Sequence, residues 1–428
     1  MNPPDTLTNP VKRVLAASLI GTTIEFFDFY IYATAAVLVF PKLFFPTSDP
    51  ASATLQSLAT FALAFLARPI GAALFGHFGD RKGRKTTLVA ALMTMGPSTV
   101  AIGLLPGYAS IGIAAPILLA LFRFGQGLGL GGEWGGAVLL ATENAPPGKK
   151  AWYGMFPQMG AAIGFLLSSG TFMLLSKTMT DQQFLSYGWR IPFVASALLV
   201  WVGLYVRLKL SETPDFMKVI ENNTRVKVPL ADVFVKHTKA IALGTLATTI
   251  TFLLFYLMTV FTLSWGTSAF HYSRTGFLIA QMVGICFFGL GIPITAVLAD
   301  RYGRNNILLL VTAGIFLFGL LFPLLFGPDN WPLTMIFLIL GMFLMGLSHG
   351  TIGTALAEIF PVSVRYTGAS LSFTLAGVLG ASPAPALATR LATNFGLNYV
   401  GYYISFAAVV SFLALVAVRE KMKEPNIG

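Results

Sequence analysis

Cysteine and charged residues are scarce in this chain. Its one cysteine, Cys286, lies within an apolar run, which excludes an internal disulfide and a thiolate metal cluster. Only 11% of the 428 residues are charged, whereas 55% are hydrophobic, and the mean hydropathy is +0.75. A soluble protein of this length needs a charged surface. The composition therefore predicts an all-α membrane protein that crosses the bilayer many times, with no separate catalytic domain.

The usual signatures of an enzyme are also missing. There are four histidines, no cluster of metal ligands and no convincing nucleophile with a base. The glycine-rich stretch GQGLGLGG lies inside an apolar run and lacks the Lys-Ser/Thr pair of a nucleotide site. We therefore expect no enzymatic activity, no metal and no cofactor. The net charge of +11 is spread over the gaps between apolar runs, which argues against a nucleic-acid-binding face.

The apolar runs are long enough to predict twelve transmembrane helices. They cover residues 13–40, 54–78, 86–106, 112–142, 151–176, 190–209, 240–269, 276–299, 306–326, 332–356, 364–390 and 398–418. The side that holds both termini carries 21 Lys and Arg residues, against five on the opposite side. By the positive-inside rule, both termini are expected in the cytoplasm.

One long polar stretch, from Ser211 to Lys239, divides the chain. We expect an N-terminal six-helix bundle at 1–210, a cytoplasmic linker with some amphipathic helix at 211–239, and a C-terminal six-helix bundle at 240–428. The halves resemble each other, because GHFGDRKGRK at 76–85 recurs as AVLADRYGRN at 296–305, and ATENAPPGKK at 141–150 as LAEIFPVSVR at 356–365. Two related bundles around a midplane site are typical of alternating-access transporters.

Four stretches resemble a known family: GTTIEFFDFYIYA, FLARPIGAALFGHFGDRKGRK, RFGQGLGLGGEWGGA and AEIFPVSVRYTGASLSF. They resemble the major facilitator superfamily, and within it the metabolite:proton symporters that carry osmoprotectants, alpha-ketoglutarate, citrate or shikimate. The resemblance covers nearly the whole chain and implies the major facilitator fold. It also implies a multi-pass protein of the bacterial cytoplasmic (inner) membrane whose partners are lipid, protons and a small-molecule substrate. We expect a monomer.

Charged residues of the repeated motifs are expected to form a cytoplasmic gate. An aspartate can sit against the positive N-terminus of a helix, and the following arginine can reach a glutamate at the end of a later helix. These contacts would form when the cytoplasmic side is shut and break when it opens. The predicted gate residues are Asp80, Arg84 and Glu143 in the first half, and Asp300, Arg304 and Glu358 in the second.

Two carboxylates, Glu25 and Asp28, lie in the middle of the first apolar run. Gly21, Glu25, Asp28 and Tyr32 share one stripe of that helix, which should face the interior. Arg123 of the fourth span lies at a similar depth to Asp28, so we predict that the two interact directly or through water. If substrate competes for Arg123, the released Asp28 takes up a proton, which couples transport to protons. A static buried pair is the alternative.

Other intramembrane polar residues complete the expected site. Arg68 and Glu133 match in depth and are predicted to form a second buried pair, with a structural role favoured over one in the pathway. Glu25 has no evident cation at its depth and is expected to be protonated, with an uncertain role. The second half offers Tyr256 and His349. The expected substrate contacts are Arg123, Tyr32, Gln126, Tyr256 and His349.

The sequence thus favours a proton-coupled symporter that imports a small polar metabolite bearing a carboxylate. Arg123 is expected to bind the carboxylate, and Asp28, Arg123 and Glu25 to couple the proton. A facilitative uniporter or exchanger, with Asp28 and Arg123 as a permanent bridge, is the alternative within transport. A sensor built on a transporter scaffold is disfavoured because no stretch outside the spans is long enough for a signalling domain.

Overall fold

The computed structural model describes residues 10–46, 50–328 and 330–421. Within these ranges the regular structure is helical and no strand occurs. The α-helices are α1 (Val11–Leu38), α2 (Phe40–Phe44), α3 (Pro50–Lys82), α4 (Arg84–Leu104), α5 (Tyr108–Ile111), α6 (Ala114–Glu143), α7 (Lys150–Thr178), α8 (Asp181–Gln183), α9 (Arg190–Leu208), α10 (Pro214–Glu221), α11 (Pro229–Lys236), α12 (Thr238–Tyr256), α13 (Thr262–Ser268), α14 (Arg274–Tyr302), α15 (Arg304–Leu325), α16 (Trp331–Ile359), α17 (Arg365–Gly380), α18 (Ala384–Phe395) and α19 (Leu397–Lys421).

The described residues contain twelve helical segments that are long and apolar enough to cross a membrane, which confirms the predicted spans. Most boundaries agree with the prediction within a few residues. Three spans are interrupted in ways that were not predicted. The sixth, Asp181–Leu208, passes through a π-helical turn, Phe184–Gly188, between α8 and α9. The seventh passes through a π-helical turn, Leu257–Phe261, between α12 and α13. The eleventh consists of α17 and α18, separated by residues 381–383.

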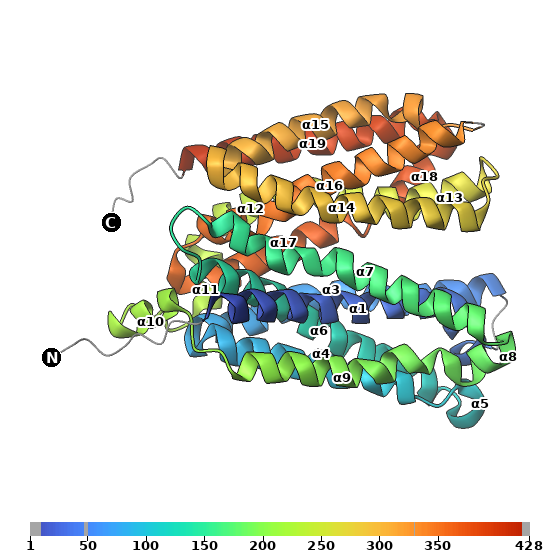
Figure 1. Cartoon of the computed structure of the whole chain (residues 1–428), viewed down its shortest axis with the longest axis horizontal. Coiled ribbons are helices and arrows are strands. Elements are labelled where there is room, and N and C mark those ends of the chain that lie inside the picture. The colour runs from blue at the N-terminus through green and yellow to red at the C-terminus, as the bar shows by residue number, and fades with distance from the viewer. Residues whose placement is uncertain (1–9, 47–49, 329, 422–428) are drawn as a thin grey trace.

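The spans lie side by side along the long axis of the molecule (Figure 1). Helices of the first half, blue to green, gather mostly on one side, and those of the second half, yellow to red, on the other. Across the boundary α3 packs on α17 and α7 packs on α14. The start of α1 and the end of α19 lie at the same end of the molecule, which we call the terminal end. This arrangement agrees with the two six-helix bundles that the sequence predicts.

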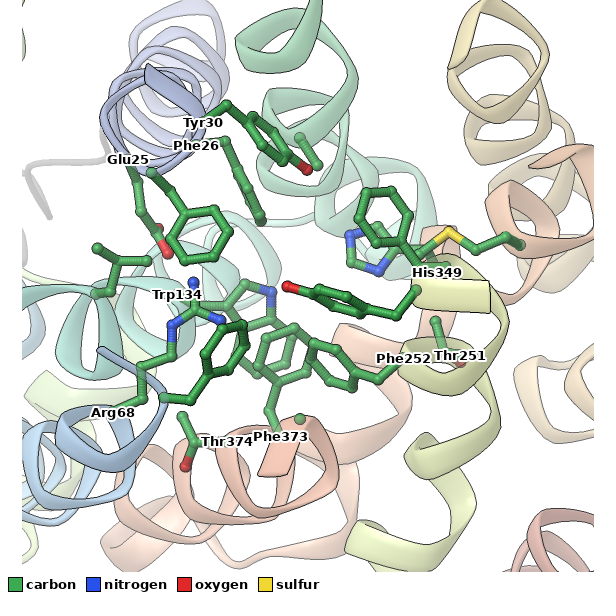
Figure 2. Close-up of a pocket in the computed structure, with 18 of the residues that line it drawn as sticks. Glu25, Phe26, Tyr30, Arg68, Trp134, Thr251, Phe252, His349, Phe373 and Thr374 are labelled. Carbon is green, nitrogen blue, oxygen red and sulfur yellow. The ribbon is translucent and has the colours of Figure 1, made fainter. Parts of the chain in front are cut away.

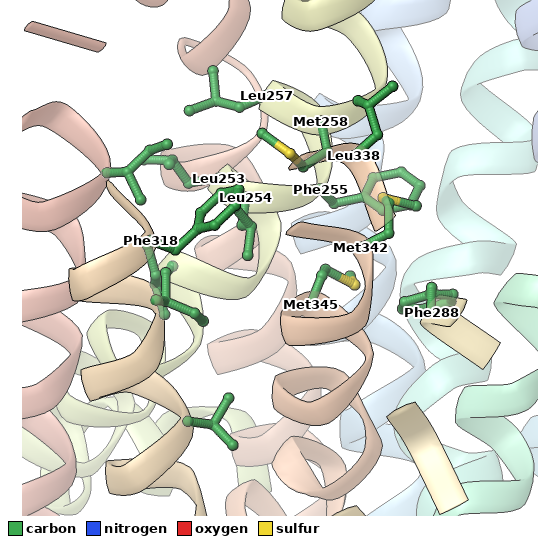
Figure 3. Packing of buried hydrophobic residues seen from close by; sticks show 14 of the residues in the cluster. Leu253, Leu254, Phe255, Leu257, Met258, Phe288, Phe318, Leu338, Met342 and Met345 are labelled. Atoms are coloured by element: carbon green, nitrogen blue, oxygen red, sulfur yellow. The ribbon is translucent and has the colours of Figure 1, made fainter. Parts of the chain in front are cut away.

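Close packing of large side chains holds the second bundle together. Figure 3 shows Leu254 and Met258 beside Phe318 and Met342 in its core, and all four are buried. Lipid tails are as apolar as these side chains, so packing between helices depends on shape rather than on exclusion from water. In the first bundle, a Cβ at Gly131 of α6 would overlap the backbone of α3 at Arg68. The glycine thus lets α6 approach α3 and fixes the position of Arg68.

The polar linker contains two short amphipathic helices, α10 and α11, at the terminal end. This confirms the expectation that the linker holds some amphipathic helix. Phe216 and Val219 of α10 are buried, as is Val233 of α11. The linker therefore packs onto the bundles through apolar side chains.

Candidate substrate and proton site

A cavity lies between the two bundles and is lined by both (Figure 2). From the first half come α1, α3, α6 and α7, and from the second α12, α14, α16 and α17. Most of the lining is aromatic. Its charged residues are Glu25 and Arg68, and its one imidazole is that of His349. A concave, mostly apolar cavity with a few convergent polar groups is the usual form of a small-molecule site.

Arg68 and Glu25 face the cavity from neighbouring helices. Figure 2 shows the Glu25 carboxylate pointing toward the Arg68 guanidinium. The Cζ atom of Arg68 lies 4.6 Å from the ring centroid of Phe29 and 5.2 Å from that of Phe65, so cation–π contacts hold the guanidinium in place. Glu25 is only 3% exposed, and its Oε2 has no hydrogen-bond partner among the described protein atoms. One cation and one acid are thus available to a ligand.

His349 of α16 faces the cavity from the second bundle (Figure 2). It is 4% exposed, and neither of its ring nitrogens has a hydrogen-bond partner within the described part of the chain. The rings of Phe288 and Phe373 lie 5.6 and 6.4 Å away, centroid to centroid. Buried polar groups are normally hydrogen-bonded, so the imidazole is available to a polar group of a ligand. Tyr256 lines the same cavity.

An aromatic stack joins the bundles at one wall of this cavity. The rings of Trp134 in α6 and Phe373 in α17 lie 3.5 Å apart, centroid to centroid, and are inclined by 6°. The Trp134 indole donates a hydrogen bond of 3.2 Å to Gln158 Oε1, which orients its ring. Because the stack links the two halves directly, it must separate if the bundles part at this point.

Asp28 lies outside the cavity lining, in a polar network inside the first bundle. Its carboxylate accepts hydrogen bonds from Thr99 Oγ1 at 2.8 Å and Ser196 Oγ at 2.6 Å. Gln126 donates to Thr99 at 2.7 Å, and Arg123 donates to Gln126 at 3.0 Å. The predicted partners are therefore connected through two intervening side chains and not by a direct ion pair.

Arg123 is enclosed by aromatic rings. It is fully buried, and its Cζ lies 4.0 Å from the ring centroid of Tyr32, 4.8 Å from that of Phe61 and 4.9 Å from that of Phe29. The Tyr32 hydroxyl is hydrogen-bonded to Thr60. Of the five expected substrate contacts, Tyr256 and His349 line the cavity, whereas Arg123, Tyr32 and Gln126 do not. The residues of the expected polar stripe on the first helix therefore do not share one site. Glu25 lines the cavity, whereas Asp28 contacts other helices of the first bundle.

The predicted pairing of Arg68 with Glu133 is wrong. Glu133 forms its ion pair with Arg207 of α9, and Arg207 also donates to the carbonyl of Leu88 at 3.0 Å. Arg207 was not among the expected site residues, although its side chain is only 2% exposed. A Cβ at Gly21 would overlap its guanidinium. Gly21 therefore makes room for the charge, and a glycine in an intramembrane polar stripe was the one signal for it.

The first set of predicted gate residues lies at the terminal end. Asp80, near the end of α3, accepts hydrogen bonds from the backbone N–H groups of Tyr366 at 3.1 Å and Thr367 at 2.9 Å. Both belong to the first turn of α17, where a carboxylate is stabilised by the helix dipole. The Arg84 guanidinium lies 2.9 Å from Asp80 and 3.5 Å from Glu143. Asp80 thus ties the first bundle to the second.

The second set repeats this arrangement with the halves exchanged. Asp300, near the end of α14, accepts hydrogen bonds from the backbone N–H groups of Ala151 at 2.8 Å and Trp152 at 2.9 Å. These residues begin α7 in the first half. Arg304 forms an ion pair with Glu358. All six predicted gate residues therefore lie in two related clusters, and their action as a gate stays a prediction.

The two clusters differ in burial. The side chains of Arg84 and Asp80 are fully buried, whereas that of Arg304 is 24% exposed. The linker accounts for part of the difference, because Thr213 donates to Glu143 at 2.5 Å and Asp215 lies 3.2 Å from Arg365. A buried charge network depends more strongly on each of its members than an exposed one. We therefore expect the first cluster to contribute more to closure of the terminal end.

Comparison with known proteins agrees with this architecture. The Major Facilitator Superfamily profile matches residues 18–385. The chain belongs to the major facilitator superfamily. It is 56% identical over 417 residues to the inner membrane metabolite transport protein YhjE of Escherichia coli strain K12, across 96% of this chain and 95% of the relative. It is 35% identical over 425 residues to the shikimate transporter of the same strain, across 96% and 95%.

Solved structures show the same fold. The major facilitator superfamily proton:xylose symporter XylE, bound to 6-bromo-6-deoxy-D-glucose, matches with a TM-score of 0.75 at 15% identity, over 96% of this chain and 95% of that one. Members of this superfamily are transporters and not enzymes, which confirms the expectation that the chain is not an enzyme. The chain is therefore a membrane transport protein.

Proposed function

We propose that the protein is a proton-coupled symporter that imports a small polar metabolite bearing a carboxylate, by alternating access. The observation that supports this most directly is the cavity between the bundles, with Arg68, Glu25 and His349 facing it. A guanidinium suits a carboxylate ligand because its donors match the two carboxylate oxygens. The names of the relatives, a metabolite transporter and a shikimate transporter, are consistent with such cargo.

The coupling that we propose follows from competition at Arg68. The sequence suggested no cation at the depth of Glu25 and a protonated acid, but Arg68 faces the same cavity. In the empty cavity an ionised Glu25 would compensate the charge of Arg68. When the substrate carboxylate binds to Arg68, Glu25 loses that compensation and takes up a proton, because an unpaired charge inside the membrane is costly. Of the three residues expected to couple the proton, Asp28, Arg123 and Glu25, this proposal keeps Glu25 and replaces the other two with Arg68. Asp28 and Arg123 would then position α1 against α6 from outside the cavity.

The two charge clusters would act as the gate at the terminal end. We propose that this end faces the cytoplasm of a bacterial inner membrane, as the positive-inside count suggests. The clusters hold this end shut while the cavity is accessible from the other side. We also propose the division into 1–210, 211–239 and 240–428, and a monomer as the working unit, because the two halves of a single chain form the cavity between them.

Uptake into proteoliposomes tests this function. The purified protein would be given an inward proton gradient and labelled monocarboxylates (shikimate, gluconate), dicarboxylates (malate) and zwitterions (valine). We expect accumulation of a carboxylate that a protonophore abolishes. Arg68→Gln should abolish it as well, whereas Arg390→Gln, at an exposed position, should not. If the protonophore leaves the uptake of every transported compound unchanged, proton coupling is ruled out and a uniporter or exchanger is favoured.

The same assay separates the two candidate coupling sites. If Glu25 and Arg68 couple the proton, uphill uptake should survive Asp28→Asn at a reduced rate and be lost in Glu25→Gln. If Asp28 and Arg123 couple it, as the sequence alone suggested, the results should be reversed. Thermal unfolding of each variant shows whether a loss of uptake reflects a loss of folded protein.

A further inference from the structure

We infer that the cavity carries a monocarboxylate together with one proton, so that neither the loaded nor the empty transporter moves net charge across the membrane. This inference rests on the proposed function and adds the charge class of the substrate and the proton stoichiometry. It follows from the number of charged groups that face the cavity.

The lining of the cavity offers one positive and one negative side chain, Arg68 and Glu25. The other charged groups that act on Glu25 are Glu133 and Arg207, and these two pair with each other. They therefore add no net charge. The remaining titratable lining residues are His349, Tyr30 and Tyr256, so no further fixed charge faces the substrate.

His349 is unsuited to carry a second positive charge. Its ring is buried between phenylalanine rings, and none of the described protein groups hydrogen-bonds to it. A charged imidazole in such surroundings would be buried without a hydrogen-bonded counterion. The neutral ring can still accept or donate one hydrogen bond to a hydroxyl of the substrate. The cavity thus compensates one negative charge of a ligand and no more.

The charges can be followed through the cycle. In the empty transporter, Glu25 and Arg68 cancel. In the loaded transporter, the substrate carboxylate cancels Arg68 while Glu25 carries one proton, taken from the solution that the cavity faces and released on the other side. The cavity is neutral in both states. Net charge inside a bilayer is costly. Because neither state carries net charge in the cavity, both can change between the two open conformations.

Other charge classes do not fit this scheme. A dicarboxylate would leave one negative charge without a partner in the loaded cavity. A zwitterion could neutralise Glu25 and Arg68 together without any proton, and its transport would then not be coupled. The presence of one guanidinium and one carboxylate in the lining therefore favours a monoanion, with an apolar or ring-shaped body that packs on the aromatic lining.

Uptake at a clamped membrane potential tests this inference. Proteoliposomes with valinomycin and set potassium concentrations would be assayed with the compound that the proton gradient accumulates. If each transport cycle carried one net positive charge inward, an inside-negative potential of about 100 mV would raise the accumulation of substrate roughly fifty-fold. We expect a monocarboxylate whose uptake follows the pH difference and changes less than about twofold with this potential. Proton-driven uptake that rises with the potential, or that prefers malate or valine, would overturn the inference.

Two variants sharpen the test. Glu25→Gln imitates the protonated acid. The loaded transporter should therefore still change between its two open states, whereas the empty transporter, in which the charge of Arg68 is uncompensated, should not. We expect exchange of labelled for unlabelled substrate to persist and proton-driven net uptake to fall at least tenfold. Glu25→Asp should restore part of the net uptake. If His349 carried a charge, His349→Gln would make uptake sensitive to the potential; we expect it to stay insensitive. Absence of any proton-driven uptake by the unmodified protein would instead refute the proposed function.

Discussion

Replacing Asp80 with asparagine should open the terminal end of the protein. Asp80 accepts hydrogen bonds from two backbone N–H groups of α17 and from the Thr367 hydroxyl, at 2.8 Å, and pairs with Arg84. All of these contacts except the pair with Arg84 cross between the bundles. Asparagine can keep one or two of the hydrogen bonds, but it lacks the negative charge that the N-terminus of α17 and Arg84 require.

The magnitude can be worked from these contacts. A hydrogen bond to a charged group contributes about 1.5 to 3 kcal/mol, and a carboxylate at a buried helix N-terminus up to about 2 kcal/mol. Because asparagine retains part of the hydrogen bonding, we expect a net loss of about 3 kcal/mol in the closed state. This changes the ratio of closed to open molecules by roughly a hundredfold.

Asp300→Asn is the matched control, because Asp300 makes the related contacts with α7 in the less buried cluster. We expect it to shift the equilibrium by less than Asp80→Asn. Spin labels on the terminal ends of α3 and α17, introduced as cysteines after replacement of Cys286, would report the separation of the bundles. Unchanged label distances in Asp80→Asn, in a protein that remains folded, would refute the assignment of this cluster as a gate.

Three further outcomes are expected. Glu133→Gln leaves a buried arginine without its partner and should lower the free energy of unfolding by about 3 kcal/mol, whereas Glu358→Gln, in the more exposed pair, should lower it by less than about 1 kcal/mol; both can be measured by denaturation in detergent. Trp134→Ala removes the aromatic stack between the bundles and should speed the efflux of preloaded substrate in the absence of a proton gradient. An efflux rate equal to that of the unmodified protein would contradict this expectation. Gly21→Ala should lower the melting temperature because its Cβ meets a guanidinium, while Gly170→Ala, with open space around it, should not.

The fold was predictable because its signal is repeated. Each span is an apolar run of about 20 residues, and twelve such runs leave little freedom for another architecture. The gate clusters were located for a related reason, since the repeated motifs place Asp80 and Asp300 at corresponding ends of two helices. The π turn at Leu257–Phe261 lies within apolar sequence and had no comparable signal. The break at 381–383 did have one that the prediction did not use, because it contains Pro383, and proline does not fit a helix interior.

The residues that line the cavity were less predictable, because a helix inside a bundle has neighbouring helices on all sides and a polar side chain can face any of them. Glu25 and Asp28 are three residues apart, and three residues turn a helix by about 300°, so the two carboxylates point to different neighbours. Matching residues by depth along the membrane suggested Arg123 for Asp28 and Arg68 for Glu133, but depth does not show which way a side chain faces, and the second pairing was wrong. Arg207 was missed because its place near the end of α9 resembled that of a loop cation.

The linkage between substrate binding and protonation is the central claim, and proton uptake on binding tests it most directly. The purified protein in weakly buffered detergent solution, with a pH indicator, would be mixed with the transported monocarboxylate. We expect about one proton to be taken up for each substrate bound, and none by Glu25→Gln. Binding without proton uptake, or uptake that persists in Glu25→Gln, would contradict the account.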